Sequence, residues 1–362
     1  MSALTRQLGG VPGVLSAEEV GVTATYLADL QRPSGLIPWF EGGHCDPWNQ
    51  VEAAMALTVT GHVDAARAGY RWLAGNQLGD GSWFNYYLGD RVRDPRLDTN
   101  VCAYVAAGVY HFAVATGETD LAVELWPVVE RAVEFVLGWQ LSDGTIRWSL
   151  DAQGRPESYA LLTGSSSILH SLRCAVALAE LLDHARPAWE LAAGRLGHAV
   201  AHHPGAFAPK NEFAMDWYYP IFSGALVGES ATRRLDAGWE RHVMDDYGVR
   251  CVSTSDWVTA AETAECVLTL DAMGLTTRAL DLFALTRRHR CADGAYLTGI
   301  AYPGGQTFPQ GERTSYTAAA VLLAADALTS SSPAAGLFRP DELARPLDLP
   351  EPGCPLGPSV AP

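Results

Sequence analysis

The feature that most constrains the fold is an alternation in the length of the links between twelve predicted helices. Apolar residues recur with helical spacing over 16–31, 46–60, 62–77, 98–116, 119–140, 160–183, 187–202, 215–228, 231–246, 259–273, 276–291 and 313–329. Some links are as tight as Thr60-Gly61-His62, whereas those over 32–45, 78–97, 141–159, 203–214, 247–258 and 292–312 are long. Because short links make antiparallel hairpins, we expect all the long links at the opposite end of the molecule. No strand pattern is evident.

The helices of this repeat are of two kinds. Those beginning near 46, 98, 160, 215, 259 and 313 are rich in small apolar residues, so we expect them to be buried. Their partners carry more charge, as in Arg233, Arg234 and Glu240. Six buried and six amphipathic helices predict an all-α fold, an (α/α)6 barrel with an inner and an outer ring over residues 1–330. Residues 331–362 are rich in proline, and we expect a tail that wraps the surface or is partly disordered.

A related phrase ends several of the outer helices. It is Gln77-Leu78-Gly79-Asp80-Gly81-Ser82-Trp83 after one helix and Gln140-Leu141-Ser142-Asp143-Gly144, followed by Trp148, after the next. Asp-Gly after a helix is typical of a C-cap and turn, because glycine adopts the left-handed conformation at little cost. We therefore interpret the phrase as structural, turning the chain from the outer ring toward the mouth of the barrel.

Charge and cysteine content exclude several functions. A formal net charge of −16 makes nucleic acid an unfavourable partner. The sequence contains no basic amphipathic segment for a membrane surface, no apolar run of the ~20 residues that cross a bilayer and no signal-peptide pattern. The seven cysteines are scattered without a CxxC pair, so we expect reduced thiols in the cytoplasm and no metal site or other cofactor.

Acids, amides and aromatic rings gather where the inner helices are predicted to begin, and these ends should surround one cavity. Such clusters suit a sugar, because rings take its apolar face while carboxylates and amides take its hydroxyls. Helix capping is the alternative explanation for each single acid. The predicted substrate-binding residues are Trp39, His44, Trp48, Trp83, Tyr87, Asp98, Asn100, Glu212, Asp216, Trp217, Tyr218 and Trp257.

Several motifs resemble those of known barrel families. Leu125-Trp126-Pro127 with Val133-Glu134-Phe135, followed by Asp143-Gly144 and Trp148, resembles the six-hairpin glycosidases of the glucoamylase-like clan. That resemblance implies hydrolysis of an α-linked oligosaccharide or polysaccharide, with inversion at the anomeric carbon. In length and Gly/Ala-rich composition the chain is also similar to the actinobacterial methylmannose-polysaccharide hydrolases, a family of endo-acting α-mannosidases.

The Gln-x-x-Asp-Gly-x-Trp phrases also resemble repeats of terpene cyclases and of prenyltransferase β-subunits, which use a related barrel. The chain lacks the Asp-x-Asp-Asp motif of class II cyclases and the Asp-Asp-x-x-Asp motif of class I enzymes; Asp94 to Asn100 and Asp245-Asp246 are the nearest matches. The adjacent residues His44-Cys45-Asp46 do not suit a single zinc ion. A terpenoid cyclase or prenyltransferase-like protein and a non-catalytic carbohydrate-binding barrel remain the alternatives to a hydrolase.

Glycoside hydrolysis needs two carboxyl groups, one on each side of the scissile bond. Glu262 lies one turn inside a predicted inner helix, and Asp46 precedes another inner helix on a well-separated part of the ring. We predict that these two acids face each other across the cavity. Our first assignment makes Glu262 the acid and Asp46 the base, with the roles left open. The sugar, the choice between endo and exo action, and the oligomeric state do not follow from the sequence.

Overall fold

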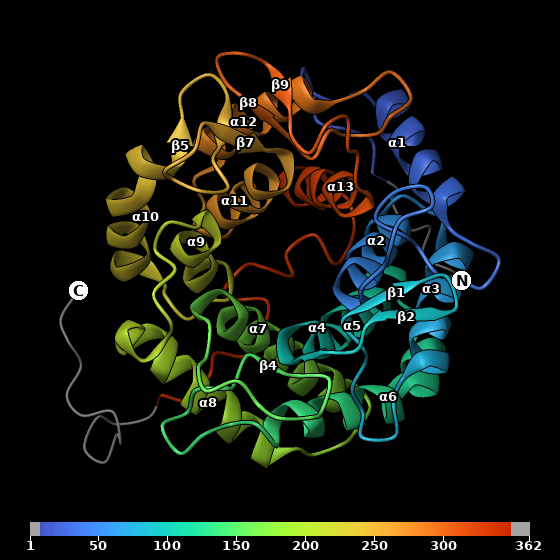
Figure 1. Cartoon of the computed structure of the whole chain (residues 1–362), viewed down its shortest axis with the longest axis vertical. Helices are drawn as coiled ribbons and strands as arrows, with labels where there is room; N and C mark the ends of the chain where they lie inside the picture. Colours follow the sequence, from blue (N-terminus) through green and yellow to red (C-terminus); the bar gives the residue numbers. More distant parts are fainter. Residues whose placement is uncertain (1–7, 349–362) are drawn as a thin grey trace.

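The computed structural model describes residues 8–348, and a ring of six helical hairpins organises them (Figure 1). The inner ring consists of α2 (Pro47–Val59), α4 (Thr99–Ala103) continued by α5 (Val105–Thr116), α7 (Leu162–Leu181), α9 (Ala214–Phe222), α11 (Ala260–Ala272) and α13 (Ser315–Thr329). The outer ring consists of α1 (Ala17–Leu30), α3 (Val63–Asn76), α6 (Asp120–Leu137), α8 (Pro187–His202), α10 (Gly228–His242) and α12 (Thr276–Leu285). The predicted (α/α)6 barrel is confirmed.

Contacts between neighbouring inner helices close the ring. Each inner helix packs on the next, and α13 packs on both α11 and α2. The hydroxyl of Ser315, at the start of α13, donates to the amide oxygen of Asn49 (2.9 Å) and to the Pro38 carbonyl (2.8 Å). Among the residues of α2 only Trp48 is not buried, whereas α10 buries the one stripe expected of an outer helix.

Short strands form within the long links. They are β1 (Tyr86–Leu88), β2 (Arg91–Asp94), β3 (Leu97–Asp98), β4 (Ser149–Leu150), β5 (Val243–Met244), β6 (Gly248–Val249), β7 (Trp257–Thr259), β8 (Gly299–Ala301) and β9 (Gln306–Thr307). All pairings are antiparallel, and β7, β8 and β9 form a three-stranded sheet. They were not predicted, because runs of two to four residues are too short to show alternation.

The repeated Asp-Gly phrase fastens one outer helix to the next. Gly81 has φ +95°, and a Cβ built there would lie 2.2 Å from the carbonyl oxygen of Arg131 in α6. The amide of Gln77 donates to the carbonyls of Gly81 (2.9 Å) and of Val128 in α6 (2.8 Å). The equivalent glycines Gly35, Gly144 and Gly294 approach α3, α8 and α1 in the same way. The phrase is therefore structural, as predicted.

One inner helix is shorter than the sequence predicted. The expected helix 215–228 ends at Phe222, because Gly224 adopts a left-handed φ of 77° and the chain is extended at Val227. The next helix accordingly begins at Gly228 rather than at 231. The early end leaves room for the chain that follows α13.

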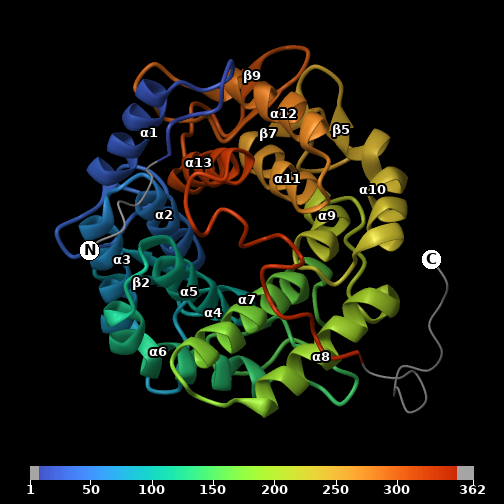
Figure 2. The same ribbon diagram turned by 180° about the vertical axis from the view of Figure 1, so that it is seen from behind.

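Residues 331–348 close the end of the barrel where the inner helices finish, and Figure 2 shows them crossing the centre of the ring. Phe338 stacks on Phe222 of α9 at 4.3 Å, and Leu337 and Leu343 are buried. Arg173 of α7 donates to the carbonyls of Pro340, Leu343 and Ala344 and to that of Ser223. This part of the predicted tail is packed against the barrel more deeply than a surface wrap; 349–362 lie outside the described residues. No helix within 8–348 is long and apolar enough to cross a membrane.

Candidate active site

A cavity of about 210 Å³ opens among the beginnings of the inner helices. It combines three carboxyl groups with indole, phenol and thioether side chains. Its walls come from α2 and the link before it, from α9, from α11 and from α13. The lining residues are Trp39, Asp46, Trp48, Asn49, Met215, Ala261, Glu262, Glu265 and Tyr316.

Asp46 is held in place by its role at the start of α2. It is the N-cap residue, and its Oδ1 accepts the backbone N–H of Asn49 (2.8 Å), with proline at the first helical position. Its Oδ2 accepts the indole N–H of Trp39 (2.6 Å). Only 6% of the residue is exposed, and this burial raises the pKa of Asp46 to about 6, helped by the charge of Asp98, although the hydrogen bonds oppose the rise.

Glu262 lies in the first turn of α11 and lines the same cavity as Asp46. It is partly exposed, and its Oε2 accepts the hydroxyl of Thr259, the residue that precedes the helix. The structure thus brings together the two acids that the sequence pointed to, although they are far apart along the chain.

Two acids on the inner helices are buried: Glu265, in the cavity wall, and Glu52, outside it. Both carboxylate oxygens of Glu265 accept tyrosine hydroxyls, one from Tyr218 and one from Tyr219 (3.0 Å). Glu52 accepts the hydroxyl of Tyr104 (2.7 Å). Burial raises the pKa of Glu52 to about 7 and that of Glu265 well above its usual range. These carboxyl groups therefore add less negative charge to the site at neutral pH than their number implies.

Asp98 repeats the arrangement of Asp46 one hairpin further along the chain. It is the N-cap of α4, accepting the backbone N–H groups of Asn100 and Val101, and its Oδ2 accepts the indole N–H of Trp148 (2.7 Å). Burial raises its pKa to about 6. Asp98 does not line the cavity. Its charge nevertheless acts on Asp46 and Tyr86, so it lies beside the cavity.

Aromatic rings surround the opening. Trp39 has its ring centroid 4.4 Å from that of His44 and 5.0 Å from that of Tyr316. Trp48 is stacked on Tyr104 at 4.9 Å. His44 also lies against Tyr86, and burial together with Arg93 lowers its pKa. Of the predicted sugar-binding rings, Trp39 and Trp48 line the cavity and His44 contacts its rim.

Several predicted binding residues are in the core instead. Trp83 is fully buried and donates its indole N–H to the Leu73 carbonyl. Tyr87 is 4% exposed, with its hydroxyl accepting the Phe84 N–H. Tyr218 is fully buried on Glu265. All three rings are buried among other side chains, so the expectation that they offer faces to a sugar is wrong.

Two residues at the start of α9, Asp216 and Trp217, turn away from the cavity. Trp217 is 5% exposed and donates to the carbonyls of Arg234 and Leu235 in α10. Asp216 is buried and accepts the N–H and hydroxyl of Thr163. Both line a separate cavity on the outer ring, so neither is available to a ligand that touches Asp46 and Glu262.

Three other predicted residues lie near the mouth without lining the cavity. Glu212 accepts the N–H of Ser253 through its backbone carbonyl, and Trp257 of β7 donates to the carbonyl of Phe308. Asn100 follows Asp98, and its buried Oδ1 has no hydrogen-bond partner within residues 8–348.

Five residues of the cavity wall were not among the predicted site residues. They are Asn49, Met215, Ala261, Glu265 and Tyr316. Helical spacing carried a signal for Glu265, which lies three residues after Glu262 on the same helix. Asn49 and Tyr316 follow the first residues of α2 and α13, which were already expected at the mouth.

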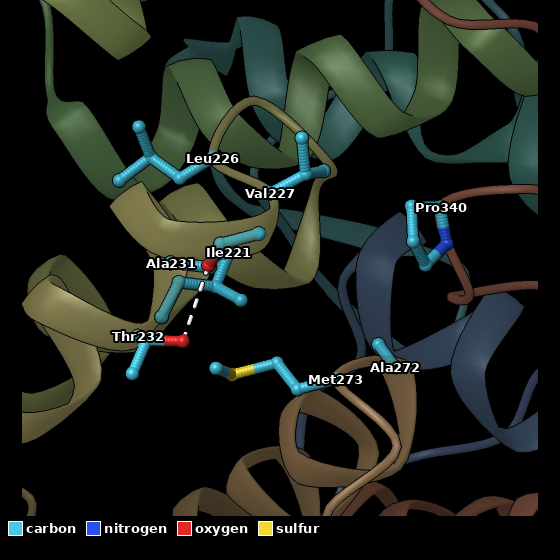
Figure 3. Close-up of a pocket in the computed structure, with 9 residues that line it drawn as sticks. Ile221, Leu226, Val227, Ala231, Thr232, Ala272, Met273 and Pro340 are labelled. Carbon is cyan, nitrogen blue, oxygen red and sulfur yellow. Dashed lines mark hydrogen bonds between the residues drawn. The ribbon is translucent and has the colours of Figure 1, made fainter.

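Another cavity lies at the closed end, between the ends of α9 and α11 and the segment carrying Pro340 (Figure 3). It measures about 140 Å³, and its lining contains no titratable side chain. It offers no chemistry for bond cleavage. Within the described residues no group of three or more His, Cys, Asp and Glu side chains is placed to hold a metal ion.

A six-hairpin barrel with acids and aromatic rings around one cavity is the architecture of the (α/α)6 glycosidases, and solved structures share this fold. A glycosidase variant in complex with glucose matches with a TM-score of 0.69 at 14% identity, covering 87% of this chain and 97% of that one. An α-amylase from Clostridium perfringens matches at 0.63 and 10% identity, covering 85% and 97%. A D-mannose isomerase matches at 0.61 and 13% identity, covering 87% and 98%, so the fold alone does not fix the chemistry.

Sequence comparison is more specific. The chain is 49% identical over 339 residues to the MMP endo-(1,4)-3-O-methyl-α-D-mannosidase of Mycolicibacterium hassiacum, covering 94% of each protein. It belongs to the family of that endo-mannosidase and is a glycoside hydrolase. The resemblances to the six-hairpin glycosidases and to the methylmannose-polysaccharide hydrolases are thereby confirmed. The cyclase and non-catalytic alternatives are not supported. No protein-family model matches the chain.

Proposed function

We propose that this protein cleaves internal α-(1,4) linkages of a 3-O-methylated mannan with Asp46 and Glu262 as its two catalytic carboxyl groups. The observation that carries the assignment is the single cavity lined by both acids. The 49% identical relative, whose name specifies that substrate and endo action, supports the choice of sugar. The aromatic rim supports binding of a pyranose ring.

The environments of the two acids support Asp46 as the proton donor, which reverses our first assignment. A general acid must hold its proton near the working pH, and burial raises the pKa of Asp46 to about 6. Glu262 is the more exposed of the two, as a group that activates water requires. Asp46 then protonates the departing glycosidic oxygen, while Glu262 takes a proton from the water that attacks the anomeric carbon.

In this mechanism the hydroxide of that water replaces the leaving sugar on the opposite face, so the first product has inverted anomeric configuration. Positive charge develops on the sugar ring in the transition state. The Glu262 carboxylate in the cavity wall stabilises that charge. Proton NMR of the first-formed product tests inversion directly, since a retaining enzyme would release the α-anomer.

The test of the pair uses Asp46→Asn and Glu262→Gln. With 3-O-methylated α-(1,4)-mannooligosaccharides, we expect each variant to lose about 10²–10⁴-fold in kcat. An aryl glycoside with a good leaving group needs little protonation, so it should restore turnover to Asp46→Asn and not to Glu262→Gln. Asp256→Asn, which changes an exposed acid shortly before α11, is the matched control. Equal losses in the control, or full activity in both variants, would refute the assignment.

We further propose that the protein works in the cytosol. The six cysteines of the described residues, such as Cys45, Cys102 and Cys266, are all free thiols. Free thiols suit a reducing compartment. Fractionation of the native source with an antibody against the protein checks this, and recovery outside the cell would contradict it.

A further inference from the structure

Most polar side chains in the cavity wall already have partners inside the protein. The amide of Asn49 donates to the Ile37 carbonyl (3.0 Å) and its oxygen accepts the Ser315 hydroxyl (2.9 Å). Both oxygens of Glu265 accept tyrosine hydroxyls. Asn49 and Glu265 thus have fewer positions left for a sugar hydroxyl, and a buried hydroxyl without a partner weakens binding.

Two apolar side chains lie in the same wall. Met215 is the second residue of α9, and Ala261 is the second residue of α11, the neighbouring inner helix. Ala261 directly precedes Glu262 and lies one helical turn before Glu265, on the same face of α11. Apolar surface is thus placed immediately beside a catalytic carboxyl group. Methionine adapts its shape to irregular apolar partners.

We propose that Met215 and Ala261 form an apolar seat for the O-methyl group of the substrate and so determine the preference for methylated over unmethylated mannan. This inference rests on the proposed function and deepens it. A methyl ether removes the donor that the wall cannot satisfy and buries a methyl group instead. The seat thus selects the substituent next to the bond that Asp46 and Glu262 act on.

The size of the effect follows from the area buried. One buried methyl group contributes roughly fourfold to binding, equivalent to about 0.8 kcal/mol. The unpaired hydroxyl of the unmethylated sugar increases the difference further. We therefore expect kcat/KM for 3-O-methylated α-(1,4)-mannooligosaccharides to exceed that for unmethylated chains of equal length by at least tenfold.

Met215→Gln tests the seat, because glutamine nearly matches methionine in size but offers an amide to a hydroxyl. We expect the ratio of the two kcat/KM values to fall at least fourfold. Met215→Leu keeps the wall apolar and should retain most of the preference. Ala261→Ser places a hydroxyl on the α11 side of the seat and should lower the ratio independently, which covers the case that Met215→Gln does not fold.

Met273→Gln is the matched control, since Met273 lines the apolar cavity at the closed end (Figure 3), and its ratio should equal that of the wild type. A wild-type ratio near one, or an unchanged ratio in folded Met215→Gln and Ala261→Ser, overturns the seat while leaving the hydrolase intact. If the wild-type protein cleaves neither mannan, the proposed function itself fails, and the seat fails with it.

Discussion

The indole of Trp39 tunes the acid that we assign as proton donor. Its N–H is 2.6 Å from Oδ2 of Asp46, and this hydrogen bond lowers the pKa that burial raises. Because the proton donor must be protonated, kcat/KM should fall as the pH rises through the pKa of Asp46 in the free enzyme, about 6. The environment of one carboxyl group thus sets the alkaline limit of activity.

Trp39→Phe keeps a ring in the wall but removes the donor, so the pKa of Asp46 should rise and the alkaline limb of the pH profile should move to higher pH. A hydrogen bond worth about 1 kcal/mol corresponds to somewhat less than one pH unit. Trp148→Phe, which removes the same kind of donor from Asp98, should move the limb much less. A limb that stays in place or moves to lower pH in Trp39→Phe would contradict Asp46 as the donor.

At this scale the sequence predicted that two acids, Asp46 and Glu262, would lie at one cavity, but it did not predict which rings would join them. Asp46 and Glu262 could be found because caps and first turns lie at a helix end whose position the repeat defines. Trp83 and Trp39 could not be distinguished, since each stands in a link beside polar residues. Which way a ring points depends on the helix that the link meets: Trp83 donates to Leu73 in the core, whereas Trp39 donates to Asp46.

Among the elements, the Asp-Gly phrase makes the strongest prediction of stability. Gly81→Ala would place a Cβ 2.2 Å from a backbone oxygen of α6 at a φ of +95°. We expect the free energy of unfolding to fall by about 2 kcal/mol or more. Gly75→Ala, inside α3 with no heavy atom near its Cβ position, should raise it by about 0.5–1 kcal/mol. Urea titrations compare the two; equal effects would refute the role of the phrase.

The hairpin repeat could be predicted because each hairpin carries the same kinds of turn and packing residues. The end of α9 could not be predicted from apolar periodicity, since Gly224 and Val227 follow a sequence that is apolar enough to continue a helix. The helix ends just before the left-handed Gly224, and a distant segment covers that end, since Phe338 stacks on Phe222 at the last turn of α9. Contacts of this kind lie beyond the reach of local periodicity.

For the whole molecule, the closed end of the barrel depends on Arg173. Its guanidinium is buried, forms no ion pair with a carboxylate of residues 8–348, and donates to four backbone carbonyls, three of them in the segment after α13. Arg173→Met should lower the free energy of unfolding by about 3 kcal/mol or more and expose 331–348 to limited proteolysis. Arg345→Met, in an exposed ion pair with Asp341, should change it by less than about 0.5 kcal/mol. Equal protease resistance in both variants would refute this role.

The contact of α13 with α2 has a consequence for synthesis of the protein. The cavity is lined by Asp46, which caps the first inner helix, and by Tyr316 of the last inner helix. A nascent chain that has not yet reached α13 therefore lacks part of the cavity wall. At a synthesis rate of roughly 5–20 residues per second, Asp46 is made on the order of tens of seconds before the last inner helix. The cavity is therefore complete only after α13 has been synthesised.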